Sequence, residues 1–170
     1  GRVVFVCRIK AAIKPIPQKK QKDIRIARAE VSRVDRPFSS SFNVFQDNDE
    51  IRIRVKTAGD LNINVFSVSQ DGRVVQLLPN PYVQLEKISS GQDLIFPDEA
   101  MRAAGFKLRV HTPKNLSKAY ETIMIIATKE KKEFLSAESE NATLSDLMRE
   151  LSLLEPSFWV DAVIGYEVRR

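Results

Sequence analysis

The stretch that most constrains the fold is residues 61–80, in which two β-rich apolar segments lie on either side of a short polar turn. In the first segment, apolar residues alternate with Asn62 and Asn64, so that one face of an extended strand is apolar and the other is polar. Asp71 and Gly72 occupy the turn, where glycine adopts the positive φ of a tight β-turn because it has no Cβ atom. This stretch predicts a β-hairpin.

The second half of the first hairpin strand is apolar on both faces, because Phe66 and Val68 follow the alternating residues out of phase. A strand that is covered on both sides is typical of the centre of a sheet. The return strand at residues 74–78 ends at Pro79, which has no backbone donor. If Leu77 of this strand is buried, its replacement by alanine is expected to cost about 2–5 kcal/mol of folding free energy.

Further strands are predicted wherever apolar and polar side chains alternate with a period of two. They cover residues 2–13, 42–45, 50–57, 94–96, 106–112, 120–128 and 158–169. Residues 23–36 fit either a strand or a helix, and we favour a strand because Pro37 ends the segment before a helix can grow long. The segment 51–78 is predicted to form a three-stranded meander, and residues 98–105 a single helical turn.

One amphipathic helix is predicted near the C-terminus, at residues 143–154. Thr143 and Asp146 have the spacing of a capping pattern, and Pro156 follows the segment. The apolar stripe has the three- and four-residue spacing of a helix face and comprises Leu144, Leu147, Met148, Leu151 and Leu154. Many short strands with this helix and a final strand favour a mainly β fold, an antiparallel β-sandwich that is immunoglobulin-like in general architecture.

By this pattern the chain divides into three parts. Residues 1–40 hold the N-terminal strands and a basic connector, which we expect to pack on the main domain. Residues 41–133 form the β-sandwich core, and residues 134–170 add the helix and the closing strand. No signal-peptide pattern begins at Gly1, and we expect the chain to be an excised fragment.

The positive charge is concentrated at one end: the 170-residue chain has a net charge of +5, whereas residues 1–36 alone carry +8. Such a segment can bind nucleic acid, anionic lipid or another anionic polymer, or it can be a solvated linker. Residues 10–36 contain no aromatic side chain, which argues against binding of single-stranded nucleic acid. The longest apolar run, residues 123–127, is far shorter than the roughly 20 residues of a transmembrane helix.

The sequence shows no catalytic or metal-binding constellation. Cys7 is the single cysteine, and its phase predicts a small buried side chain on a strand. His111 is the single histidine and is expected to be exposed; Ser69 and Asp93 would complete a hydrolase triad on paper, but no serine lies in a nucleophile elbow. Residues 47–50 lack EF-hand spacing and are read as a turn. We therefore predict no enzyme activity, no cofactor and no metal.

Aromatic side chains beside loops give one candidate binding surface, which comprises Asn80, Pro81, Tyr82 and Trp159. Tyr82 follows the hairpin, and Trp159 begins the last strand. Aromatic residues in such positions often carry the energy of protein binding. For Trp159 the alternative is packing beneath the helix at 143–154, and we favour that alternative.

Several motifs in the middle of the chain, taken in order, are similar to those of the bacterial DUF4384 family, a domain of unknown function. They are Val65-Phe66, Asp71-Gly72, Leu77-Leu78-Pro79-Asn80, Gly91, Phe96-Pro97 and Ile126-Ala127-Thr128. The resemblance covers residues 45–133, about half of the chain. Such domains occur in bacterial envelope lipoproteins and beside kinase-like or caspase-like chains as accessory modules, and the family brings no catalytic residues.

The resemblance implies a non-catalytic accessory or binding module of a cell-envelope protein, a lipoprotein that is periplasmic or anchored in the outer membrane. Its partner would be a protein or a cell-wall component. The alternative, which comes from the charge distribution, is a basic module that binds nucleic acid or another anionic polymer. A salt titration separates the two, because binding to phosphates weakens steeply as the salt concentration rises.

Overall fold

The computed structural model describes residues 23–39, 43–84, 87–135 and 141–170, and in this part the chain is mainly β, as predicted. The strands are β1 (Arg25–Arg33), β2 (Asn43–Gln46), β3 (Glu50–Ala58), β4 (Asn62–Val68), β5 (Val74–Leu78), β6 (Asp93–Phe96), β7 (Leu108–Arg109), β8 (Lys118–Thr128) and β9 (Trp159–Arg169). Two helices, α1 (Glu99–Ala103) and α2 (Leu144–Ser152), complete the described elements. The predicted strand at 2–13, with Cys7, lies outside the described residues.

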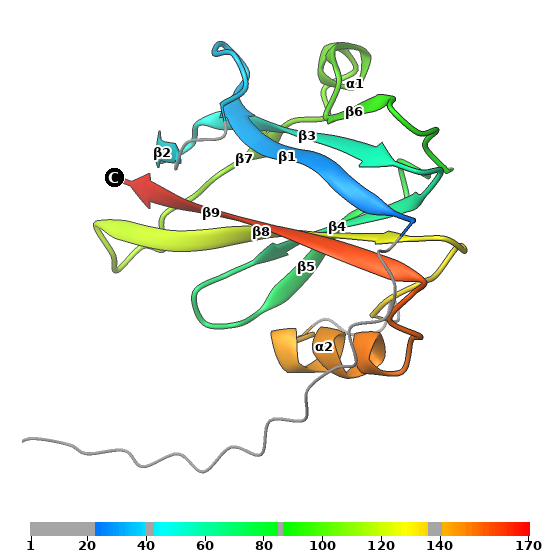
Figure 1. Ribbon diagram of the computed structural model, residues 1–170. Coiled ribbons are helices and arrows are strands. Elements are labelled where there is room, and N and C mark those ends of the chain that lie inside the picture. The colour runs from blue at the N-terminus through cyan, green and yellow to red at the C-terminus, as the bar shows by residue number, and fades with distance from the viewer. Residues whose placement is uncertain (1–22, 40–42, 85–86, 136–140) are drawn as a thin grey trace, which may run out of the picture.

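The strands form two sheets, which lie one above the other in Figure 1. One sheet has four strands in the order β1-β3-β6, with β7 also paired to β3, and the other has five in the order β2-β9-β8-β4-β5. α2 covers the outer side of the five-stranded sheet, and α1 lies beside β6 on the far side of the molecule (Figure 1). The described strand pairs are antiparallel except for β2 and β9, which run parallel.

The predicted hairpin is confirmed as β4 and β5, and β4 lies between β5 and β8 inside its sheet. Gly72 has a φ of +82° in the turn. A register shift between Val65 and Phe66 gives β5 one extra residue, so that Leu78 enters the core with 0% exposure while Leu77 is half-buried. The condition on which the large cost of Leu77→Ala depended, burial of Leu77 in the core, is therefore met by its neighbour Leu78 instead.

The predicted three-stranded meander is wrong, because β3 and β4 belong to different sheets. The chain crosses between the sheets at Gly59, whose φ is +111° and whose N–H donates to the Ser90 hydroxyl at 2.9 Å. A Cβ atom at this position would lie 3.2 Å from the side chain of Ile24. An alternating pattern identifies each strand, but the turn residues between two strands do not reveal whether the strands pair or separate.

The ambiguous segment at 23–36 contains β1, a strand, as favoured from the sequence. Val31 of β1 is fully buried and packs in the same apolar cluster as Ile53 of β3 and Ile63 of β4. This cluster contains residues of both sheets and fills the space between them. Burial of such a shared cluster is the main source of folding free energy in a fold of this kind.

A second apolar cluster lies between the five-stranded sheet and α2. It is possible because β8 is apolar on both faces, as predicted: Ile123 and Ile125 face the first cluster, and Met124 and Ile126 face the second. β8 pairs with β4 and with β9, so its predicted central position is confirmed.

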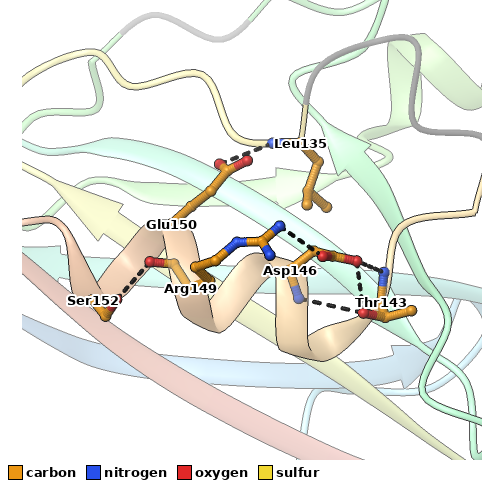
Figure 2. Close-up of polar contacts among 6 residues, drawn as sticks. All are labelled: Leu135, Thr143, Asp146, Arg149, Glu150 and Ser152. Atoms are coloured by element: carbon orange, nitrogen blue, oxygen red, sulfur yellow. Dashed lines mark hydrogen bonds and ion pairs between the residues drawn. The ribbon is translucent and has the colours of Figure 1, made fainter.

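The predicted C-terminal helix is confirmed as α2, with the capping box between Thr143 and Asp146 that the sequence indicates. Figure 2 shows these contacts: the Asp146 backbone N–H donates to the Thr143 hydroxyl at 3.3 Å, and the Thr143 N–H donates to the Asp146 carboxylate at 3.0 Å. Of the predicted stripe, Leu147 and Leu151 are buried, whereas Leu144 and Met148 are 37% and 46% exposed. The helix buries a narrower face than its spacing predicts.

The predicted strand at 106–112 is mostly irregular, and its paired part is β7 alone. Beyond Arg109 the chain is held by the turn after β2: the Val110 N–H donates to the Asp49 carbonyl at 3.1 Å, and the Asn48 N–H donates to the Val110 carbonyl at 2.8 Å. Asn48 has a φ of +70°, which confirms the turn predicted at 47–50. The alternation of side chains thus continues past Arg109, although no described strand pairs with this segment.

Candidate functional site

One concave site is a groove at one open edge of the space between the two sheets. One lip is β5 with the end of β4, and the other is β7 with the segment that follows it, residues 110–116. The groove consists of two adjoining hollows of about 230 and 510 Å³, which share His111 and Glu121 in their linings. The walls of the narrower hollow are largely apolar and comprise Ile51, Val75, Leu77, Leu108, Val110 and Ile123.

A carboxylate lies on the inner face of the five-stranded sheet in this groove. Glu121 is directly opposite Tyr166 in the register of β8 and β9, and the Tyr166 hydroxyl donates a 2.8 Å hydrogen bond to the Glu121 carboxylate. Burial raises the pKa of Tyr166 far above its ordinary value of 10.0, and the negative charge of Glu121 acts in the same direction, while a hydrogen bond with Ser67 opposes it. Tyr166 therefore remains a neutral donor that holds Glu121 in place.

The phenol ring of Tyr166 is itself fixed by packing. It is only 2% exposed, and it meets Phe45 of β2 edge-on, with the ring centres 5.4 Å apart. Edge-to-face contacts of this kind add to the stabilisation that comes from burial alone. The position of Glu121 in the groove is thus set by a strand pair, a hydrogen bond and an aromatic contact.

The opposite lip is held by hydrogen bonds from distant parts of the chain. The Thr112 N–H donates to the Asp47 carboxylate at 2.7 Å. The Arg170 guanidinium donates to the carbonyl of Thr112 at 3.0 Å and to that of Lys114 at 2.8 Å. These contacts give an irregular segment a defined position beside the groove.

Several positive side chains line the groove, and most have acidic or amide partners of their own. The Arg73 Nε atom lies 2.7 Å from the Asp71 carboxylate, and Arg109 donates to the Asn48 side chain at 2.9 Å. His111 is 65% exposed at its side chain, as predicted, and its Nδ1 atom lies 3.9 Å from the Asp47 carboxylate. Among the described residues, no cationic side chain forms an ion pair with Glu121.

The outer edge of β5 lies beside the groove and is only partly paired. Thr143, at the start of α2 (Figure 2), bridges Arg73: the Val74 N–H donates to the Ala142 carbonyl, and the Leu144 N–H donates to the Gly72 carbonyl, both at 2.9 Å. In the described part of the chain, β5 pairs with β4 on its inner edge, and no strand pairs with its outer edge beyond this bridge. Among the described residues, the outer edge of β5 beyond the bridge is thus in the state in which an edge can act as a template for another strand.

Three of the four residues of the predicted binding surface form one loop directly after β5. The Asn80 side chain accepts from the backbone N–H groups of Tyr82 and Val83, at 2.9 and 2.8 Å, and donates to the Leu77 carbonyl at 2.7 Å. This network orders the loop and leaves Pro81 exposed and Tyr82 87% exposed. The fourth residue, Trp159, is half-buried and packs against the cluster beneath α2.

The hypothetical hydrolase residues are divided between two places. Ser69 and His111 both line the wider hollow of the groove. Asp93 lies on β6 of the four-stranded sheet, where its carboxylate is 4.0 Å from the Lys56 ammonium group. Within the described residues, no group of three or more histidine, cysteine or acidic side chains has the arrangement of a metal site.

Sequence reasoning missed the two polar residues that define the narrow hollow, Glu121 and Ser67. A signal was present, because each is in phase with the buried apolar residues of its own strand. A polar residue on an inward-facing position requires a hydrogen-bond partner or access to solvent. At the open edge, Glu121 and Ser67 have a hydrogen-bond partner in Tyr166 and also line a hollow that solvent reaches.

A comparison with protein families gives one match, to a domain of unknown function (DUF4384), over residues 44–131. A search of curated proteins and a search of solved structures find no significant match. No helix in the described residues has the length and apolar character needed to cross a membrane. Because the matched segment spans more than half of the chain and includes both lips of the groove, the chain belongs to the DUF4384 family.

Proposed function

We propose that this chain is a non-catalytic binding module of a bacterial cell-envelope protein, a lipoprotein of the periplasm or outer membrane, and that it binds a protein or a cell-wall component. The observation that carries this proposal is the Asn80 loop. Hydrogen bonds of the Asn80 backbone and side chain order a surface segment, and the segment presents Tyr82 with 87% of its surface exposed. An exposed aromatic on an ordered loop needs little further ordering when it binds, which favours affinity.

The absence of catalysis in this proposal rests on the arrangement of reactive side chains. The single histidine is exposed and lies near Asp47, and Asp93 lies on β6, where its carboxylate is 4.0 Å from the Lys56 ammonium group. Nucleophilic catalysis needs a base within hydrogen-bond reach of the nucleophile and a third group that orients the base. These supporting observations concern the described residues.

We also propose that the two sheets form a β-sandwich of the immunoglobulin-like kind in its general architecture. The supporting observation is the apolar cluster that both sheets share. The parallel pair of β2 and β9 is a departure from a purely antiparallel sandwich.

The binding proposal is tested with purified envelope material. The protein is incubated with peptidoglycan sacculi and, separately, with vesicles made from outer-membrane extract, and the fraction that sediments is measured. We expect sedimentation with one of the two, and a several-fold lower fraction for Tyr82→Ala. Tyr120→Ala is the matched control, because Tyr120 is 50% exposed on β8 and does not line the groove.

Sedimentation with neither material, or an equal loss for both tyrosine variants, would contradict the proposal. Salt provides a second criterion. The fraction bound should change little between 50 and 200 mM salt, which is the range in which binding through several phosphate contacts falls by about 10³–10⁵-fold.

A further inference from the structure

We propose that the groove and the outer edge of β5, which pairs with no described strand beyond the Thr143 bridge, bind an extended polypeptide segment that contains a lysine or an arginine. The segment adds as a strand to β5, and its cationic side chain enters the narrow hollow and meets Glu121. This inference rests on the proposed binding function and specifies its partner as a polypeptide.

The first argument is the state of the β5 edge. Thr143 already bridges the first part of this edge, so the edge accepts a strand-like partner in the folded protein. In an antiparallel ladder, alternate residues point their backbone N–H and C=O groups outward. Because Val74 donates outward to Ala142, Gln76 is the next residue of β5 to face the same way. An added strand would use its backbone groups.

The second argument is charge. Glu121 accepts a hydrogen bond from Tyr166, which is neutral, and among the described residues it has no cationic partner. The nearby Arg73 and Arg109 are engaged with Asp71 and Asn48. A carboxylate in a partly enclosed site gains most from an ammonium or guanidinium group, because hydrogen bonds between charged groups are about twice as strong as those between neutral groups.

The third argument is the size and the lining of the hollow. Its volume of about 230 Å³ is below the roughly 300–1,000 Å³ of sites for drug-sized molecules, and Val75 and Leu77 of β5 form part of its wall. Its apolar walls suit the methylene groups of a long side chain, and its polar end suits the charged head. A peptide side chain that enters beside Val75 and Leu77 would satisfy both requirements.

The test is an NMR titration of the ¹⁵N-labelled 170-residue protein with synthetic seven-residue peptides of alternating threonine and valine. The central residue of the peptide is lysine, arginine, norleucine or glutamate. We expect the lysine and arginine peptides to shift the amide signals of residues 75–78 and of Glu121. We expect their Kd to be about tenfold lower than that of the norleucine peptide, which lacks the charge.

Two protein variants localise the effect. Glu121→Gln keeps an acceptor for the Tyr166 hydroxyl and should remove the tenfold preference for lysine over norleucine. Glu130→Gln is the matched control, because Glu130 is exposed just beyond the other end of β8, and it should leave the preference unchanged.

Any of three results would overturn this inference. They are amide signal shifts outside the groove, equal affinity for the lysine and norleucine peptides, and an unchanged preference for lysine in the Glu121→Gln variant. The proposed binding function is judged separately by the sedimentation of the Tyr82→Ala variant. If that variant loses binding while the peptides show no preference, the binding module stands and the assignment of a cationic polypeptide falls.

Discussion

The register shift in the hairpin leads to a prediction about two adjacent leucines. Leu78 is fully buried in the cluster between the sheets, whereas Leu77 is half-buried and lines the groove. Replacement of a fully buried leucine by alanine removes its transfer free energy and leaves a cavity, so Leu78→Ala should cost about 3 kcal/mol. Leu77→Ala removes the same atoms from a site that solvent already reaches, and it should cost about 1 kcal/mol.

Urea titration followed by the fluorescence of Trp159 measures both values. For a slope of about 2 kcal/mol/M, the midpoint should fall by about 1.5 M for Leu78→Ala and by about 0.5 M for Leu77→Ala. The slopes should not change, since neither variant alters the surface exposed on unfolding by much. If the urea midpoint falls equally for both variants, or falls further for Leu77→Ala, the register of β5 is not the one described.

Two further predictions concern polar contacts. Thr143→Val removes the hydroxyl that caps α2 and should lower the free energy of unfolding by about 1 kcal/mol, which thermal unfolding detects as a lower Tm. The Arg102 guanidinium beside Glu50 lowers the pKa of that carboxyl below its ordinary 4.5. The folded protein therefore binds fewer protons than the unfolded chain, so this stabilisation is complete above about pH 5 and is lost as the pH falls through the lowered pKa. A series of Tm values from pH 7 to pH 3 should show this loss, and Glu50→Gln should make the descent shallower; an equally steep descent in that variant would contradict the assignment.

The sequence predicted those elements whose pattern depends on a single strand or helix. β3 and β8 follow from their own alternation of side chains, and α2 follows from its capping pattern and its stripe. In these elements local preference and burial agree, so a short window contains all the required information.

The pairing of strands was not predictable in the same way. The separation of β3 from β4 at Gly59 depends on contacts with Ile24 and Ser90, which are 35 and 31 residues away in the chain. The sequence gives no sign of these contacts. The extra residue in β5 likewise depends on its register with β4, and it decides which of two adjacent leucines is buried.

Of the two parts of the candidate site, the loop was predictable from the sequence and the groove was not. The loop at Asn80–Tyr82 was found because turn residues and an aromatic lie together in the sequence, although its role as a binding surface is still a prediction. The groove was missed because Glu121 appears as one polar residue within an apolar strand. Glu121 lines a groove only because the space between the sheets is open at this edge. The edge is open because β7, on the opposite sheet, is short.

The position of β9 bears on how this domain can be divided. The segment that matches the family, residues 44–131, ends before this strand, yet β9 pairs with β8 along its whole length of 11 residues. A polypeptide cut at 131 would leave β8 with an open side, and an exposed apolar strand edge promotes aggregation. The smallest piece able to fold alone is therefore longer than the stretch by which the family is recognised, and an expression boundary should follow the final strand.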